Sequence, residues 1–292
     1  MTADGSTGSG GSRTDGAGPG GDARLDRALV ARGLARSRTL AARLVDAGVV
    51  LVDGVAVTKP SHRVGEGTRI DVSRPERYVS RAAHKLVAAL DAFQGVDPSG
   101  RVALDLGAST GGFTQVLVER GVRHVLAIDV GHDQMNPAVA DDPRVTSLEG
   151  VNARDLDAAS LRERLPGDAP DPADIDLVVG DLSFISLRHV LAPIRRTVRA
   201  DADLVLLVKP QFEVGRTGVR GGIVTDPALA RDAVRGVLDA AHATGLGIRG
   251  IIASPIEGTH GNRELVVHFA PDGTDPTEWT RRLDELTTGG RA

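Results

Sequence analysis

The strongest constraint on the fold lies in residues 102–118, which read VALDLGASTGGFTQVLV. This stretch starts with a short apolar run of the type found in buried strands, and it ends with apolar residues at helical spacing. Gly107, Gly111 and Gly112 crowd the turn between the two halves. Such a turn lets the backbone approach a ligand closely, beside the positive N-terminal end of a helix. Because the spacing is not the dinucleotide fingerprint G-x-G-x-x-G, a nicotinamide enzyme is the weakest interpretation.

Strand and helix patterns alternate through the rest of the chain. Apolar runs predict further strands at residues 125–128, 145–148, 174–181, 204–208, 250–253 and 265–269. Helices are predicted from Ser80, a candidate N-cap, from Leu182, and over residues 227–244. This order predicts an α/β fold with a Rossmann-like, doubly wound and mostly parallel sheet.

Charged residues stand where these predicted strands end. Asp105, Asp129, Asp181 and Lys209 each close a strand. Ligands of doubly wound sheets bind at the carboxyl ends of the strands, and an acidic residue roughly 20 positions after the glycine loop binds a ribose hydroxyl there. Four such residues together predict a functional site.

The net charge of −4 hides an asymmetry along the chain. It is the sum of −1 for residues 1–21, +4 for residues 22–75 and −7 for residues 76–292. A small basic module on a larger acidic domain indicates that the module holds a polyanion.

The basic module has a pattern of its own. Residues 23–32 and 37–48 have helical spacing, residues 49–52 and 55–57 have strand character, and Asp53-Gly54 is a turn signal between the two strands. The run RLDRALVARGLARSRTLAARLVDAGVVLVDG resembles the S-four-type RNA-binding domain. That resemblance implies a small α+β domain whose arginines contact RNA phosphates, and the positions it indicates are Arg24, Arg36, Arg38 and Arg43.

Composition excludes several other classes. The chain has no cysteine, which rules out disulfides and thiolate metal sites. No apolar run approaches the roughly 20 residues of a membrane span. Residues 1–21 lack an apolar core and read as a disordered tail rather than a signal peptide, so a cytoplasmic protein is expected.

Lysine is rare among the cations. Only Lys59, Lys85 and Lys209 are lysines, whereas the other 32 basic residues are arginines. A lysine that persists against this bias indicates a place where a guanidinium does not fit or cannot lose its proton.

The ordered set of motifs identifies a family. An acidic strand end followed by G-x-x-x-G-G resembles the first motif of class I S-adenosylmethionine-dependent methyltransferases. Together with it, RYVSRAAHKL, AIDVG, GDLSFISL, LVKPQFEVGR and SPIEGTHGNRE resemble the TlyA family of rRNA 2′-O-methyltransferases, which have an FtsJ-type catalytic domain. The resemblance runs through about residues 23–270, although GHDQMNPAV follows Asp129 where the family more often has a GYGQL-like run. Some members of the family were first named as haemolysins.

The resemblance implies a cofactor, a substrate and a set of domains. The cofactor is S-adenosylmethionine, no metal is needed, and the partner is ribosomal RNA or a ribosomal subunit. The target is a cytidine in 16S rRNA, with 23S rRNA left open as a second target and the oligomeric state also left open. The expected parts are a tail over residues 1–21, an RNA-binding domain over 22–75, a linker over 76–79, a methyltransferase domain over 80–272 and a C-terminal tail over 273–292.

The same resemblance implies which residues act. Its Lys-Asp-Lys-Glu tetrad maps onto Lys85, Asp181, Lys209 and Glu264, with Lys209 as the base and Lys85 holding the ribose. The residues expected at the cofactor are Asp105, Gly107, Ser109, Thr110, Gly111, Gly112, Phe113, Asp129, Val130 and Asn152. The chemistry suits these residue types, because a ribose 2′-hydroxyl is a poor nucleophile and a desolvated lysine can take its proton where an arginine cannot.

Two other function classes stay open at this point. A pore-forming haemolysin requires a membrane-inserting segment, and the sequence has neither a long apolar helix nor a large cationic amphipathic one. A non-catalytic RNA-binding protein explains the basic module but not four charged residues at strand ends.

Overall fold

The structure is a computed structural model that describes residues 22–35, 37–46, 48–72, 77–215, 218–219, 221–258 and 261–288. The chain divides into two compact units, residues 1–77 and residues 78–292. The predicted N-terminal tail, residues 1–21, lies outside the described residues, as does Arg36.

The smaller unit combines two helices with short strands. Its elements are β1 (Ala23–Arg24), α1 (Leu25–Ala31), α2 (Arg38–Asp46), β2 (Val50–Val52), β3 (Val55–Ala56), β4 (Arg63–Val64) and β5 (Ile70–Val72). Strands β3, β2 and β5 form an antiparallel sheet, and β1 pairs with β4. Apolar side chains of α1, α2 and the sheet, among them Leu25 and Val45, enclose a small core. This is the small α+β domain that the sequence predicts, although Ala23 and Arg24 form a strand rather than the first turn of a helix.

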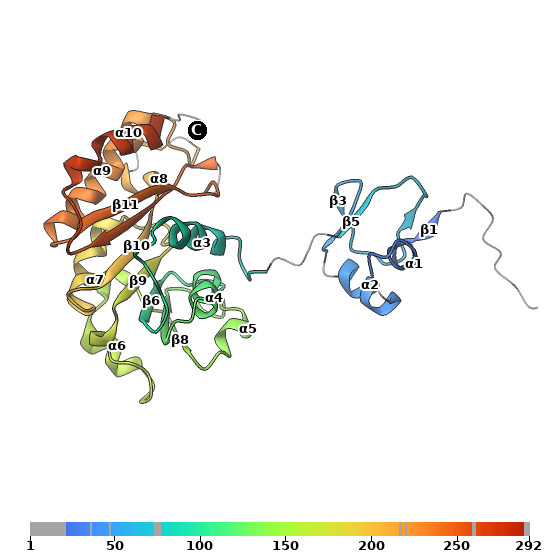
Figure 1. Cartoon of the computed structure of the whole chain (residues 1–292), viewed down its shortest axis with the longest axis horizontal. Helices are drawn as coiled ribbons and strands as arrows, with labels where there is room; N and C mark the ends of the chain where they lie inside the picture. The colour runs from blue at the N-terminus through green and yellow to red at the C-terminus, as the bar shows by residue number, and fades with distance from the viewer. Residues whose placement is uncertain are drawn as a thin grey trace, which may run out of the picture. The chain divides into compact units, whose positions relative to one another are not determined.

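The larger unit is built on a seven-stranded sheet in the order β11-β12-β10-β9-β6-β7-β8 (Figure 1). Its strands are β6 (Val102–Leu106), β7 (His124–Asp129), β8 (Val145–Glu149), β9 (Leu177–Gly180), β10 (Asp203–Val208), β11 (Gly247–Ala253) and β12 (Leu265–Ala270). Five neighbouring strands run parallel, whereas β12 is antiparallel to both β10 and β11. The predicted doubly wound, mostly parallel sheet is confirmed.

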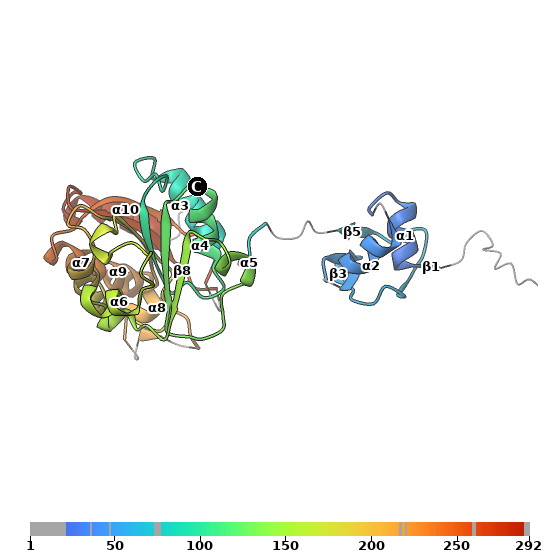
Figure 2. The same ribbon diagram turned by 90° about the horizontal axis from the view of Figure 1, so that it is seen from below.

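Helices cover both faces of this sheet, which explains why its central strands are continuous apolar runs. On one face α3 (Ala83–Ala92) and α4 (Gly112–Glu119) pack against one apolar cluster. On the other face α6 (Ala158–Arg164), α7 (Leu191–Thr197), α9 (Pro227–Ala243) and α10 (Thr280–Thr288) contact a second cluster. Figure 2 shows α3 and α4 on one side of the strands and α6, α7 and α9 on the other. The short helices α5 (Pro137–Ala140) and α8 (Pro210–Glu213) follow β7 and β10.

Two predicted helix starts are wrong. Helix α3 begins at Ala83 instead of Ser80, because Ser80 accepts a hydrogen bond from Ala82 N (3.1 Å) in the turn before the helix. Residues 182–186 are irregular, and the 3-10 helix η3 (Leu187–His189) and then α7 follow. The buried Glu213 carboxylate accepts from Leu187 N (2.8 Å) and from Ser186 Oγ (2.5 Å), which fixes where η3 starts.

The described part of the expected C-terminal tail, residues 273–288, also differs from that expectation. They contain the 3-10 helix η6 (Pro276–Trp279) and α10, which packs against α9 and the sheet. Leu283 is fully buried in the core, and Leu286 packs against it. The helix has a narrow apolar stripe between exposed charged residues, a pattern that is weak in so short a segment.

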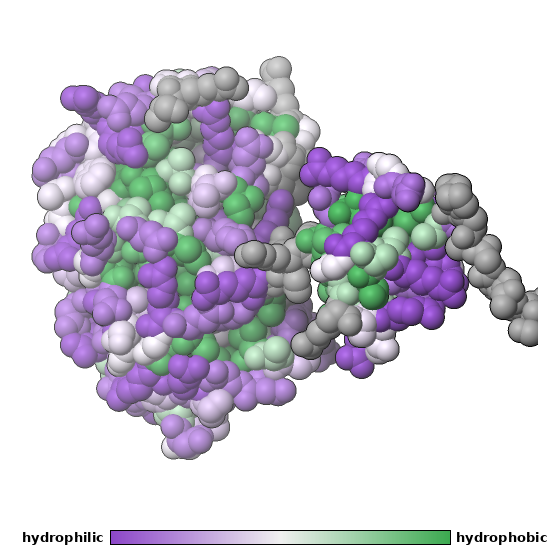
Figure 3. Space-filling view, turned by 45° about the vertical axis from the view of Figure 1, so that its right-hand side comes forward, coloured by the Kyte–Doolittle hydropathy of each residue, from purple (hydrophilic) through white to green (hydrophobic). Residues whose placement is uncertain are grey.

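The surface of the larger unit mixes hydrophilic and hydrophobic residues on the face seen in Figure 3. Within the described ranges, no helix combines the length and the apolar character needed to cross a bilayer.

A substitution at Leu283 tests whether α10 is part of the folded unit. Leu283→Ala should lower the free energy of unfolding by about 2–5 kcal/mol, since it leaves a cavity in the core. Arg281→Ala, on the exposed side of the same helix, is the matched control. Urea unfolding monitored by circular dichroism gives both values. Equal midpoints for the two variants would show that α10 does not contribute to the core.

Candidate active site

Four charged side chains meet at the edge of the sheet where the parallel strands end. Lys85 comes from α3, Asp181 follows β9, Lys209 follows β10 and Glu264 precedes β12. Lys85 Nζ lies 2.7 Å from Glu264 Oε2 and 3.2 Å from Asp181 Oδ2. Lys209 Nζ lies 2.7 Å from Asp181 Oδ1. Asp181 therefore joins the two ammonium groups, and the four residues expected from the tetrad form one cluster.

This cluster is almost completely removed from water. Its side chains are 9% (Lys85), 14% (Asp181), 7% (Lys209) and 3% (Glu264) exposed. Burying ions is costly unless each is paired and hydrogen-bonded, and removal of one partner leaves an uncompensated charge. Two cations facing two carboxylates satisfy this condition, and Asp181, the most exposed member, marks the side from which a ligand can enter.

Two further polar side chains belong to this cluster and were missed by the sequence analysis. Lys209 Nζ donates to Ser183 Oγ at 2.8 Å, and Gln211 Nε2 donates to Glu264 Oε1 at 3.3 Å. Both lie within two residues of a tetrad member, in GDLSF and VKPQF. That proximity is the one sequence signal that could have found them.

The glycine loop between β6 and α4 approaches the same edge. Gly107 (φ +76°), Ser109 (φ +46°) and Gly111 (φ +90°) have left-handed backbone conformations. A Cβ at Gly107 would lie 3.2 Å from a Leu182 methyl group. Glycine at 107 therefore keeps this part of the loop close to the segment after β9 and leaves its backbone accessible.

Asp129, at the end of β7, holds the glycine loop in place. Its carboxylate accepts from Ser109 N (2.8 Å) and from Gly131 N (2.7 Å). Ser109 Oγ in turn donates to Gln134 Oε1 (3.1 Å), a residue of the GHDQMN run that departs from the family pattern. Asp129 thus has a structural role in the loop, and it also faces a cavity.

A cavity of about 560 Å³ opens between the glycine loop and the segment after β9. Five of the residues expected at the cofactor line it: Gly107, Ser109, Asp129, Val130 and Asn152. Asp181 of the tetrad also lines it, together with residues 182–185, which the sequence analysis did not place at a cofactor site. The other five, Asp105, Thr110, Gly111, Gly112 and Phe113, stand outside this lining; all but Thr110 are buried.

An aromatic pair stands beside this cavity. Phe184, which lines the cavity, is 91% exposed and has a strained backbone at φ +64°. Its ring lies 5.3 Å from that of Phe212, whose centroid is 5.9 Å from Lys209 Nζ. An apolar ring held in water at a cost in backbone strain indicates a contact surface for a ligand.

The four arginines expected at RNA differ in their surroundings. Arg24 and Arg38 both pair with the buried carboxylate of Asp26, at 3.1 Å each. The Arg24 guanidinium holds the pKa of Asp26 below its usual range, with Arg38 adding to the effect and burial opposing it. Arg43 is exposed on α2, and Arg36 lies outside the described residues. The positive charges of two of the four arginines are thus partly neutralised by a carboxylate of the smaller unit itself.

Metal ligands do not gather anywhere in the described ranges. No group of three or more histidine, aspartate or glutamate side chains there has the arrangement of a metal site.

Comparison with known proteins agrees with this geometry. Residues 78–270 match the FtsJ-like methyltransferase family, and residues 23–70 match the S4 domain. The chain is 48% identical, over 83% of its own length and 87% of the relative, to the 16S/23S rRNA (cytidine-2′-O)-methyltransferase TlyA of Mycobacterium tuberculosis.

The chain belongs to the TlyA family of FtsJ-like methyltransferases.

Other TlyA-family relatives have a different name. Hemolysin A of Brachyspira hyodysenteriae is 35% identical over 84% of this chain and 99% of its own. A solved structure from Streptococcus thermophilus, described as a hemolysin, is 33% identical, covers 92% of this chain and 95% of its own, and gives a TM-score of 0.66. Relatives named TlyA and relatives named hemolysin thus both match most of this chain.

One carboxyl of this TlyA-family site is buried behind the glycine loop. Asp105 Oδ2 accepts a hydrogen bond from Thr114 Oγ1 (2.7 Å), whereas Oδ1 is buried with no hydrogen-bond partner among the described residues. Burial raises the pKa of Asp105 to about 7, against the lowering effect of Thr114 and with small contributions from Asp181 and Asp129.

The raised pKa of Asp105 predicts a pH dependence of stability. Between the unfolded value of 3.8 and about 7, the folded state binds this proton and the unfolded state does not. The stabilisation that the folded state gains by binding this proton is therefore complete at low pH and is lost as the pH rises towards 7. Relative to Asp105→Asn, the wild type should lose about 2–3 kcal/mol of unfolding free energy between pH 5 and pH 8. Urea unfolding at both pH values measures the difference.

Asp201→Asn is the control for this titration. Its carboxylate is exposed and its pKa is lowered by Arg199, so it stays ionised across the same range. A wild-type stability that runs parallel to that of Asp105→Asn from pH 5 to pH 8 would contradict the raised pKa.

Proposed function

We propose that this protein transfers a methyl group from S-adenosylmethionine to the ribose 2′-hydroxyl of a cytidine in ribosomal RNA. One observation carries the proposal: the Lys209 amine is held by Asp181, and Asp181 also lines the 560 Å³ cavity beside the glycine loop. The residue that holds the proposed proton acceptor, Lys209, is thus also part of the cavity lining. Membership of the TlyA family gives the reaction class and the substrate, since its relatives are named for cytidine methylation in 16S and 23S rRNA.

The cavity suits S-adenosylmethionine, which when bound supplies an electrophilic methyl group on its sulfonium. Gly107 and Ser109 present loop backbone to the cavity, and the Asp129 carboxylate stands at a strand end where a ribose can be bound. Val130, 69% exposed, provides an apolar surface next to Asp129 for an adenine ring. Asn152 lines the same wall.

The buried tetrad prepares the nucleophile. Lys209 acts as the base in its neutral form: after its ammonium proton has passed to solvent, the amine takes the 2′-hydroxyl proton, while Asp181 and Ser183 hold that amine. Lys85, fixed by Glu264 and Asp181, is the neighbouring cation that binds the ribose. Alignment of oxygen with the methyl group contributes much of the rate, because the reacting groups are held on rigid strand ends.

The exposed aromatic pair gives the target base a place to stack. Phe184 and Phe212 lie beside Lys209 and present faces on which an unstacked base gains about 1–3 kcal/mol. A 2′-hydroxyl can reach a buried amine only if its nucleotide leaves the surrounding RNA structure. This requirement favours a substrate site that holds the base outside its helix.

The smaller, basic unit binds the RNA. We propose residues 22–75 as the RNA-binding domain, 76–79 as linker and the part that follows as the methyltransferase domain. Arg43 and Arg38 are both exposed, but Arg38 pairs with Asp26 as Arg24 does; Arg43 therefore contacts phosphate on its own, whereas Arg24 and Arg38 contact RNA as a pair oriented by Asp26. The substrate is ribosomal RNA or a ribosomal subunit, which places the enzyme with ribosomes in the cytoplasm.

Lys209→Arg tests whether this lysine accepts a proton. The charge and the pairing with Asp181 are kept, but a guanidinium cannot act as a base at accessible pH. Turnover on ribosomal subunits lacking the modification should fall by about 10²–10⁴-fold, with binding of S-adenosylmethionine retained. Mass spectrometry of the RNA locates the methylated ribose, and calorimetry measures cofactor binding.

Lys59→Arg in the smaller unit is the matched control and should be nearly silent. A Lys209→Arg enzyme within about tenfold of the wild type would refute the general-base role. A wild type that methylates no ribosomal RNA would refute the proposed function itself.

Arg43→Ala tests whether the smaller, basic unit binds the RNA. It should weaken binding of ribosomal RNA several-fold and reduce the salt dependence of affinity by about one phosphate contact, while cofactor binding is unchanged. Arg69→Ala is the control, because Arg69 is 79% exposed but pairs with Asp71. Fluorescence anisotropy over a salt series measures both. Equal salt slopes for Arg43→Ala and the wild type would remove Arg43 from the interface.

A further inference from the structure

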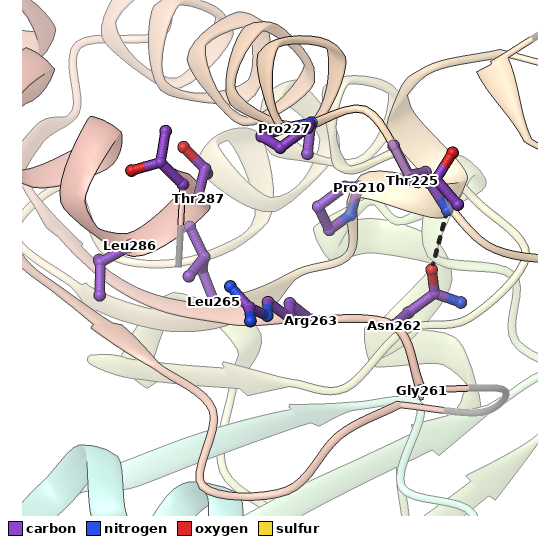
Figure 4. A pocket seen from close by; sticks show the side chains of 12 residues that line it. Pro210, Thr225, Pro227, Gly261, Asn262, Arg263, Leu265, Leu286 and Thr287 are labelled. Carbon is purple, nitrogen blue, oxygen red and sulfur yellow. Dashed lines mark hydrogen bonds between the residues drawn. The ribbon is translucent and has the colours of Figure 1, made fainter. Parts of the chain in front are cut away.

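A second cavity, of about 300 Å³, opens beside the tetrad on the face of the sheet opposite α3. Its walls come from α8, the N-terminal end of α9, the C-terminal end of α10 and the segment before β12. Figure 4 shows Pro210, Pro227, Arg263 and Leu265 around this space. We infer that this cavity binds a nucleotide of the RNA that neighbours the methylated one, with Arg263 on its phosphate. This inference rests on the proposed function.

The position of the cavity follows from the alternation of side chains around β12. Glu264 faces α3, where it pairs with Lys85, and Val266 lies in the core cluster of that face. Arg263 and Leu265 point to the other face and line the cavity. Pro210 of the lining directly follows Lys209. Two residues of the cavity lining, Arg263 and Pro210, are thus adjacent in sequence to tetrad residues. An RNA strand whose ribose lies at Lys209 therefore passes the mouth of the cavity.

The charge of Arg263 favours a phosphate. Arg263 is exposed, and no salt bridge or side-chain hydrogen bond joins it to any other residue that the structure describes. Most charged residues in the larger unit are acidic, and several of its arginines pair with carboxylates, as Arg101 does with Asp203. A guanidinium left without such a partner on the substrate edge of an acidic unit is available for a bidentate contact with phosphate oxygens.

The lining of this cavity favours the binding of a nucleotide base. Pro210, Pro227, Leu265 and Leu286 offer flat or branched apolar surfaces, and Thr225 adds a hydroxyl. Asn262 makes one wall rigid: it is buried, its Oδ1 accepts from Val224 N (3.2 Å), and its Nδ2 donates to Gly222 O (2.7 Å). The volume is at the lower end of the range of about 300–1,000 Å³ for ligand pockets, which suits one nucleotide rather than a second cofactor.

Two substitutions test the cavity in the full-length protein. Arg263→Gln removes the cation, and Ala230→Trp fills the cavity while keeping Arg263. Binding of fluorescently labelled ribosomal RNA should weaken by about five- to tenfold in each, and Arg263→Gln should lower the salt slope by about 0.7. Cofactor affinity and turnover at saturating RNA should stay within about twofold, because neither residue belongs to the tetrad or the glycine loop.

Arg123→Gln is the matched control. It removes the same charge from an exposed arginine next to the start of β7, at the other edge of the sheet. Thr225→Trp at the rim replaces Ala230→Trp if thermal unfolding shows that the latter is destabilised. The inference is overturned if Arg263→Gln binds RNA as Arg123→Gln does, or if filling the cavity leaves RNA affinity unchanged. Because binding is measured without methyl transfer, a wild type that binds RNA but does not methylate it refutes the proposed function alone.

Discussion

The Asp181 carboxylate between two buried ammonium groups is the interaction on which the site depends. Its two oxygens lie 2.7 Å from Lys209 Nζ and 3.2 Å from Lys85 Nζ, and Glu264 supplies the second negative charge. Only the sheet topology makes this cluster possible. β9 and β10 are parallel, and Gly180 at the end of β9 pairs with Leu206, two residues before β10 ends. β12 runs the other way, so that Val208 pairs with Leu265 and β12 starts where β10 ends. Glu264 therefore reaches the edge at which Asp181 and Lys209 stand.

The sequence predicts the strands of this sheet well because strands buried on both faces are nearly continuous apolar runs. It predicts the segments between them less well. Residues 182–186 were expected to open a helix, but Phe184 has a backbone at φ +64° and Glu213, distant in sequence, fixes the start of η3. α10 was expected to be part of a tail, because a single buried leucine in a charged helix is a weak signal. In both places contacts between distant segments decide the structure.

Predictions from charge have a similar limit. Arg24, Arg38 and Arg43 look equivalent in a basic sequence, yet only the fold shows that the first two share the buried Asp26 carboxylate. The scarcity of lysine was a better guide, because it depends on what the side chain can do rather than on where it lies. Lys85 and Lys209 are both in the tetrad, whereas Lys59 is exposed in the smaller unit. Ser183 and Gln211 had only their closeness in sequence to tetrad residues as a signal, and their contacts are what place them in the cluster.

The cavity beside Arg263 has its origin in the alternation of side chains at the strand ends. Residues at the ends of adjacent strands alternate between the faces of the sheet, so a segment that delivers one side chain to the chemistry delivers its neighbour to the other face. Glu264 and Arg263 are such a pair, and Lys209 and Pro210 behave in the same way at the end of β10. In the proposed complex, RNA bound across this edge contacts residues of both faces. In that proposed complex, binding of the RNA and activation of its 2′-hydroxyl use neighbouring residues of the same two segments, so a shift of β12 relative to β10 would impair both.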